Sequence, residues 1–308
     1  MGSGKAPHFE AELPFMNQWI NFPSRRLIAV RGPDAFELLQ GLVTQDINQK
    51  GLIFAALLTP SGRFHSDFFV VPDPHDGYLI DCHKNHYASI MGIFNVVKAL
   101  HDVQITDVSK EYAICAGIGP DIYDFSMDDT WDQKIGLVLR DPRHCEMGVR
   151  ALVPHKHLSV LPHALCLPGT ERDYDLFSIQ KGIPQGHRDL IVDRSIILTY
   201  GYQYINAVSW DKGCYRGQEL IARTYHRGQI RKSLFRLHLI SGLFPAVGSD
   251  LFVNDRKIGV MGGACDQWGL AALYIDCEKS TKDPFKIVSQ NDDGQEHCFR
   301  AVISRCFV

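Results

Sequence analysis

Apolar residues in the first part of the chain gather in short runs separated by glycine, proline and polar turn residues. Such runs predict β-strands, and they cover residues 26–30, 52–58, 64–71, 77–82, 103–105, 112–118, 135–139 and 148–153. Between His86 and Leu100 the apolar residues recur every three or four positions, which predicts an amphipathic helix. Shorter helical patterns cover 35–41 and 170–181. Strands and helices alternate irregularly, so we expect an α+β fold rather than a doubly wound parallel sheet.

The spacing typical of helices disappears after Lys232. Short apolar runs punctuated by glycines follow, and they predict strands over 234–240, 250–253, 258–261, 270–275 and 298–307. Several short strands in succession are typical of a small barrel or sandwich. We therefore expect a body over residues 15–230, built of two subdomains, and a C-terminal β-barrel over residues 231–308.

Composition narrows the class of protein. The 308 residues are 45% hydrophobic and 22% charged, which is ordinary for a folded soluble protein. The formal net charge of −3 does not predict general nucleic-acid binding. No apolar run is long enough to span a bilayer, so we expect no membrane partner. The nine cysteines contain no C-x-x-C pair, which indicates a reducing compartment and argues against disulfides and a structural zinc site.

Common catalytic motifs are missing from the sequence. There is no G-x-S-x-G, no P-loop and no Rossmann glycine pattern, so serine hydrolases, P-loop NTPases and dinucleotide oxidoreductases lack support. The histidines match no metal-binding spacing, and we expect no metal site. His83 and His86 open a predicted helix, where we expect them on the surface.

Residues 212–219, KGCYRGQE, hold the most reactive candidate side chain. Cys214 lies between Lys212 and Arg216, and nearby positive charge favours the nucleophilic thiolate. A helix is predicted to begin near Gln218, and its positive end would act in the same direction. The alternative is a glycine-rich turn whose cysteine is packed, and on these residues alone it is the commoner outcome.

Two neighbouring segments also leave alternatives open. Residues 216–232 carry five arginine or lysine residues and one acid, Glu219, which fits either an anion-binding surface or a solvated face. In the segment 59–69, TPSGRFHSDFF, Gly62 predicts a tight turn and Asp67 follows it. Asp67 points either into a pocket or outward from a hairpin.

The segment 212–219 matches the signature K-G-C-[FY]-x-G-Q-E, and the chain resembles the YgfZ-type family of folate-binding proteins. That family includes mitochondrial assembly factors for iron–sulfur proteins and is similar in fold to the T-protein, an aminomethyltransferase of the glycine cleavage system. The resemblance extends over residues 31–47, 57–70, 141–152, 226–239 and 258–276. It implies an α+β body around a central folate-sized cavity, a C-terminal β-barrel, binding of tetrahydrofolate and support of iron–sulfur enzymes.

The resemblance also implies roles for individual residues. Cys214, tuned by Lys212 and Arg216, would face a partner protein or a bound cluster, and Asp67 would work on the folate. The implied folate contacts are Asp67, Glu146, Arg150, Tyr215, Gln218, Glu219, Arg223 and Arg227. Of these, Gln218 and Glu219 would fix the loop by hydrogen bonds, and the glutamate tail would lie near Arg223 and Arg227.

Three functions remain open. The first is a tetrahydrofolate-binding accessory protein for maturation or repair of iron–sulfur proteins, with assembly factors or client proteins as partners. The second is a one-carbon transferase of the aminomethyltransferase type. T-proteins carry two acids where this chain has Ser66 and Asp67, which argues against that transfer. The third is a tRNA-modification factor that uses the basic segment, which ranks last because of the net charge. A bacterial cytoplasm and a mitochondrial matrix are both reducing and fit equally.

Overall fold

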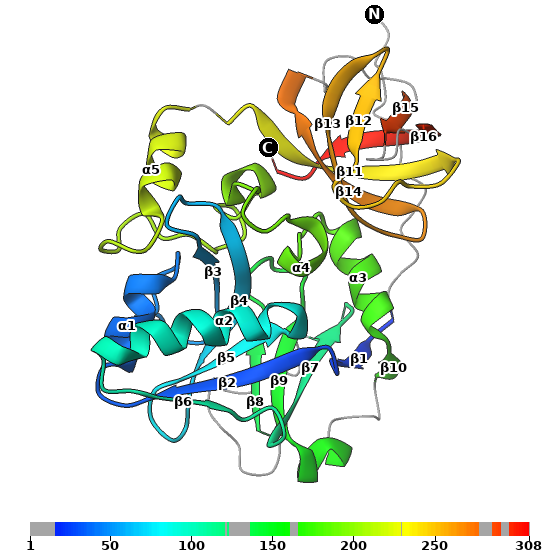
Figure 1. Cartoon of the computed structure of the whole chain (residues 1–308). Helices are drawn as coiled ribbons and strands as arrows, with labels where there is room; N and C mark the ends of the chain where they lie inside the picture. The colour runs from blue at the N-terminus through cyan, green and yellow to red at the C-terminus, as the bar shows by residue number, and fades with distance from the viewer. Residues whose placement is uncertain are drawn as a thin grey trace, which may run out of the picture.

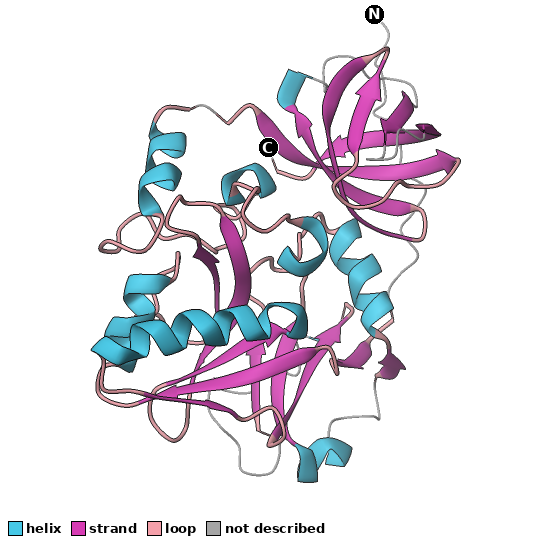
Figure 2. Ribbon diagram, viewed as in Figure 1, coloured by secondary structure: helices cyan, strands magenta, loops and turns pink. Residues whose placement is uncertain are grey.

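Two five-stranded sheets and a closed six-stranded barrel make up the part of the chain that the structure describes (Figures 1 and 2). The structure is a computed structural model, and it describes residues 16–120, 122, 136–160, 166–228, 230–276, 285–290 and 296–307. Residues 15, 135 and 308, at which three predicted ranges begin or end, lie outside the described residues. The α+β class and the C-terminal barrel are confirmed.

The first sheet is antiparallel throughout. In spatial order its strands are β3 (Ile53–Leu58), β4 (Phe64–Pro72), β5 (Tyr78–His83), β2 (Arg25–Arg31) and β6 (Gln104–Asp107). Helices α1 (Ala35–Leu42) and α2 (Lys84–Val97) pack on one face, because their apolar positions, such as Leu38 and Phe94, share a core with the strands. A short 3₁₀ turn, Lys98–Leu100, ends α2. The predicted helix over 86–100 is thus confirmed.

The second sheet packs against the other face of the first. Its strands in spatial order are β10 (Leu167–Gly169), β1 (Gln18–Asn21), β7 (Tyr112–Ile118), β9 (Val149–Pro154) and β8 (Leu137–Arg140). Only β1 and β10 pair in parallel among these described strands. The largest core joins both sheets, for example Phe69 with Leu139 and Leu152, and it continues into the barrel at Leu234.

Short elements connect the second sheet to the barrel. They are the 3₁₀ turn His155–Val160, α3 (Glu171–Gln180), α4 (Gly186–Asp189), the 3₁₀ turn Ile197–Tyr200 and α5 (Gln218–His226). Thr170 and Asp173 form a capping box at the start of α3, which explains why the predicted helix begins there. No helix in the described residues is long and apolar enough to cross a membrane.

The barrel closes because its first and last strands pair with each other. Its strands in order around the barrel are β11 (Lys232–Ser241), β14 (Trp268–Tyr274), β13 (Arg256–Cys265), β12 (Asp250–Val253), β15 (Phe285–Gln290) and β16 (Glu296–Arg305). The sequence did not predict β15, whose apolar run is short. The predicted division of the chain at residue 230 stays a prediction.

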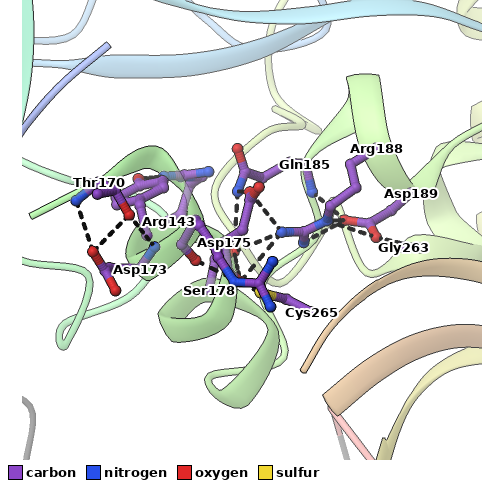
Figure 3. Close-up of polar contacts among 12 residues, drawn as sticks. Arg143, Thr170, Asp173, Asp175, Ser178, Gln185, Arg188, Asp189, Gly263 and Cys265 are labelled. Carbon is purple, nitrogen blue, oxygen red and sulfur yellow. Dashed lines mark hydrogen bonds and ion pairs between the residues drawn. The ribbon is translucent and has the colours of Figure 1, made fainter. Parts of the chain in front are cut away.

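A buried ionic network joins the body to the barrel (Figure 3). The Asp189 carboxylate accepts hydrogen bonds from the backbone N–H groups of Gln185, at 2.7 Å, and of Gly263 in β13, at 2.9 Å. It also pairs with Arg188 at 2.7 Å, and Arg188 in turn pairs with Asp175 in α3 at 2.8 Å. A side chain at Gly263 would place its Cβ 2.4 Å from Arg188 Cγ, so glycine is required there. The network fixes the barrel against α3 and α4.

Candidate functional site

Asp67 lies buried in the middle of β4, so the pocket-facing alternative fits better than an exposed hairpin. Its Oδ2 accepts hydrogen bonds from the Gly186 N–H and the Tyr202 hydroxyl, each at 2.8 Å. Burial, reinforced by the charge of Asp67, raises the pKa of Tyr202 well above its ordinary value, so the hydroxyl keeps the proton that it donates. Oδ1 accepts no hydrogen bond from the described residues. Asp67 is thus held in place with one oxygen left to accept a ligand's hydrogen bond.

Two histidines, His83 and His86, lie within range of the Asp67 charge, and the expectation that they lie on the surface is wrong. Both are buried, because the first turn of α2 packs onto the body rather than projecting from it. The rings of His83 and His187 stack with their centroids 3.7 Å apart. Burial lowers the pKa of His83 to about 4 and that of His187 to about 2. The stacked pair is therefore neutral at neutral pH.

The buried Arg143 and Arg150 and the half-buried Arg25 form what we call the arginine cluster. Their guanidinium groups lie 5.7, 4.8 and 4.3 Å from the centroid of the Phe69 ring. Asp81 pairs with both Arg25 and Arg150, and Asp141 pairs with Arg143. The three guanidinium groups are thus paired with only two carboxylates, which leaves one positive charge in excess.

The Asp81 carboxylate stays ionised inside this cluster. Burial opposes its ionisation, but the charges and hydrogen bonds of Arg150 and Arg25 together hold its pKa below the ordinary value. Nη2 of Arg150 is buried and has no hydrogen-bond partner in the described residues. An unpartnered buried donor is costly, and it favours a ligand that accepts a hydrogen bond here.

The cavity beside the cluster is small. It is lined by residues of both sheets, α3 and α4, among them Phe22, Arg143, Tyr174 and His187, and its volume is about 20 Å³. That volume holds about one water molecule. The folate-sized opening implied by the resemblance is not present between these residues, because arginine and aromatic side chains fill the space.

Glu146 and Arg150 occupy different environments. Arg150 lines the cavity and pairs with Asp81, as described above. Glu146 precedes β9 on an exposed turn, where its side chain is 57% exposed and pairs with Lys181 at 3.2 Å. It does not line this cavity. The structure therefore brings Arg150, and not Glu146, to this cavity, and Asp67 itself is not among the residues that line it.

The segment 212–219, hereafter the signature loop, is fixed against the first sheet. Lys212 Nζ donates hydrogen bonds to the carbonyls of Val43 and Gln45, at 2.8 and 2.9 Å. Gly217 adopts the left-handed conformation, with φ of 81°, and a Cβ there would lie 2.6 Å from the Thr59 carbonyl oxygen. The signature loop therefore interlocks with the predicted turn at 59–62, which explains the glycine in the motif.

Cys214 is exposed on this loop, so the packed cysteine favoured by the local residues is wrong. The Lys212 ammonium is bound by the two carbonyl groups of the segment after α1. Tyr215 is buried, which raises the pKa of its hydroxyl to about 12. The loop thus hides its tyrosine and presents its thiol to solvent.

The remaining predicted contacts lie on α5. Gln218 begins the helix, and its backbone N–H donates to the Tyr215 carbonyl at 3.2 Å. The side chain of Glu219 is 92% exposed and lies 3.9 Å from Arg223, so it does not fix the loop. Arg227 is exposed at the end of the helix. None of these four side chains lines the cavity beside the arginine cluster.

Comparison with known proteins identifies the family. No protein-family profile matches the chain. The mouse (Mus musculus) mitochondrial iron–sulfur cluster assembly factor IBA57 is 31% identical over 279 residues, which cover 83% of this chain and 77% of the mouse protein. The chain belongs to the IBA57 family. The resemblance read from the signature is thereby confirmed.

Other members of the IBA57 family match less completely. The human factor is 28% identical over 82% of this chain. The Dictyostelium discoideum and Pyricularia oryzae homologues are 30% and 31% identical, and the matches span 60% and 54% of their lengths. Among solved structures, the Bartonella henselae glycine cleavage system aminomethyltransferase T has a TM-score of 0.71 over 93% of this chain and 85% of its own, at 13% identity. The T-protein-like fold is therefore confirmed.

Sequence reasoning on this IBA57-family chain missed an aromatic pair next to Cys214. Trp210 and Tyr225 stack with their centroids 3.9 Å apart, although 38% and 44% of their surfaces are exposed. The pair joins the loop before Cys214 to α5. A tryptophan four residues before the signature cysteine was the available signal, but the stacking partner depends on the folded path of the chain.

Lys212 is expected to titrate near pH 8. Burial lowers its pKa from 10.5 to about 8, and the charge of Asp46 only partly offsets this effect. Between these two values the unfolded chain binds more protons than the folded one, so this lysine's contribution to stability rises with pH across that window. NMR of ¹³C-methylated lysines should show one resonance titrating near pH 8 that is lost in Lys212→Gln. Titration of Lys212 with the other lysines would contradict the burial argument.

Proposed function

We propose that this chain is a tetrahydrofolate-binding accessory protein for the maturation or repair of iron–sulfur proteins. The exposed Cys214, on a loop fixed by Lys212 and Gly217, is the observation that carries the proposal. Relatives over most of the chain are described as mitochondrial iron–sulfur cluster assembly factors. These relatives support a location in the mitochondrial matrix for a eukaryotic chain. For a bacterial chain the corresponding reducing compartment is the cytoplasm.

The surroundings of Cys214 suit contact with a partner protein. A thiolate is the usual protein ligand of iron–sulfur clusters, and here the thiol lies on the surface, where an assembly factor or a client can reach it. The Trp210–Tyr225 pair offers exposed aromatic surface close by in the chain. Aromatic residues are enriched where proteins bind each other. An iron–sulfur cluster that passes between this chain and a partner is a substrate here and not a resident cofactor.

The surroundings of Asp67 suit a folate head group. A pterin ring carries N–H donors along one edge, and the free Oδ1 of Asp67 is a charged acceptor for them. Arg150 Nη2 supplies an unpartnered donor, and the arginine cluster and neutral histidines supply flat faces for stacking. The residues therefore fit the group in chemistry. Because the cavity beside the arginine cluster holds only about one water and Asp67 does not line it, binding requires the side chains between Asp67 and the cluster to move apart.

Complementation tests the role of Cys214. Deleting the gene in its own organism should lower the activity of several enzymes that carry four-iron–four-sulfur clusters, and the wild-type chain should restore it. Cys214→Ala should leave activity at the level of the deletion strain. Cys298→Ala is the matched control, because Cys298 is also an exposed free cysteine but lies in the barrel, and it should restore activity fully. Full restoration by Cys214→Ala would show that the Cys214 thiol is not required for this function.

A further inference from the structure

A second and larger pocket lies where the body meets the barrel. Its volume is about 460 Å³. It is bounded by the turn before β4, by residues 191–200, by α5 and by strands β11 to β14. It shares no lining residue with the cavity beside the arginine cluster. We call it the junction pocket.

The charge of the junction pocket is strongly positive. Arg63, Arg194, Arg231 and Lys232 line it, and none of the four has a carboxylate partner among the described residues. The one lining carboxylate, Asp250, is already paired with Lys257. Four cations against this one shared carboxylate leave the pocket with an excess of positive charge, which an anion with several charges would offset.

The shape of the junction pocket is held by contacts between its walls. Arg63 donates a hydrogen bond to the Arg194 carbonyl at 3.1 Å, which fixes the turn before β4 beside residues 191–195. The backbone of Phe64 and Ser195 reinforces the same contact at 2.9 Å. Gly248 approaches Ile191 across the joint, since a Cβ on that glycine would lie 3.4 Å from Ile191 Cδ1. The cations therefore sit on connected walls rather than on separate loops.

The rest of the lining combines apolar and aromatic residues with the hydroxyls of Ser195, Thr199 and Thr224. The apolar residues of the lining are Ile191, Ile196, Ile230, Val260 and Ala272. Tyr200 and Tyr274 add rings, and Lys232 Nζ lies 4.7 Å from the centroid of the Tyr274 ring. Pockets for small molecules combine such apolar walls with a few placed polar groups. The occupant should therefore have an apolar body as well as its charges.

We propose that the junction pocket binds a small organic anion with two or more negative charges on an apolar body. Two sources supply this chemistry. One is a separate organic phosphate or polycarboxylate. The other is the oligoglutamate tail of a folate held at Asp67, because Arg63 lies four residues from Asp67 along the chain, about 13 Å in extended conformation. Only the second source rests on the proposed function.

Calorimetry tests the site by measuring how the 1-naphthyl phosphate dianion binds to the full chain at low salt. Wild type should bind it at one site, and Arg194→Gln with Arg231→Gln should weaken binding by about tenfold or more, because each charged hydrogen bond contributes strongly. The control double variant, Lys50→Gln with Lys110→Gln, removes the same charge from exposed positions of the body that do not line the pocket and should bind as wild type does. Arg194→Lys with Arg231→Lys should retain most of the affinity.

Two results would overturn the proposal: no binding by wild type, or equal weakening in the two glutamine double variants, which would indicate a general field. Tetrahydrofolate triglutamate and monoglutamate distinguish the sources. If the tail fills the pocket, the triglutamate form binds more tightly and competes with naphthyl phosphate, and Arg194→Gln with Arg231→Gln removes the difference. If a separate anion fills it, the two folates bind alike and neither competes. Absence of folate binding would contradict the proposed function while leaving the naphthyl phosphate result intact.

Discussion

Asp189→Asn should lower the free energy of unfolding by about 3 kcal/mol or more, because removing one partner of a buried ion pair leaves an uncompensated charge. The Asp189 side chain is fully buried and accepts hydrogen bonds from Gln185, Arg188 and Gly263. An asparagine amide has one acceptor oxygen and no charge, so Arg188 keeps only Asp175 as an ionic partner. The loss should be visible as a lower urea midpoint, followed by circular dichroism.

A matched control exists at the same joint. Asp266 also pairs with an arginine across the body–barrel boundary, Arg172 of α3, but the two side chains are 46% and 70% exposed. Exposed ion pairs are worth about 0–1 kcal/mol, so Asp266→Asn should change the urea midpoint little. Equal losses in the two variants would mean that burial of the Asp189 network does not secure the barrel.

Asp81→Asn should have a comparable effect on the body, again about 3 kcal/mol or more. Its carboxylate lies between Arg25 and Arg150, and the substitution would leave both guanidinium groups beside the Phe69 ring with no carboxylate in direct contact. Urea unfolding at neutral pH measures the loss. A variant as stable as wild type would show that the arginine cluster does not depend on this charge.

The effect of Asp81 should also depend on pH. Its folded-state pKa lies below the ordinary value of 3.8, so the unfolded chain binds the proton more tightly. The stability that the carboxylate contributes is therefore fully present above about 3.8 and is lost as the pH falls through the lowered pKa. The difference in the free energy of unfolding between wild type and Asp81→Asn should become smaller in acid. A difference that stays constant would contradict a lowered pKa for Asp81.

Much of the fold could be predicted because the spacing of apolar residues along the chain determines most of its strands and helices. The strand over 112–118 was predicted to the residue, since an uninterrupted apolar run is typical of a strand buried on both faces. Strands β1 and β10 were missed because they have four and three residues and form only where their partners meet. The short helix α4 was missed for the same reason.

The candidate site was less predictable, since burial of a polar side chain is decided by distant segments. The exposure of Cys214 follows from Gly217 interlocking with the turn at 59–62, a contact across more than half of the chain. His187, which stacks on His83, gave no signal in its own sequence context. The arginine cluster combines residues from β2, β9 and the turn between β8 and β9. The family resemblance supplied Asp67 and Arg150 but also suggested Glu146, which lies on an exposed turn.

Anaerobic calorimetry with tetrahydrofolate, on wild type, Asp67→Asn and Glu146→Gln, tests the central claim most directly. The account predicts one-to-one binding by wild type and a loss of about tenfold or more in Asp67→Asn, because an amide replaces the charged acceptor for the pterin N–H groups. Glu146→Gln should bind as wild type does, since that side chain is exposed and paired with Lys181. No binding by wild type, or equal binding by Asp67→Asn, would contradict a folate site at Asp67.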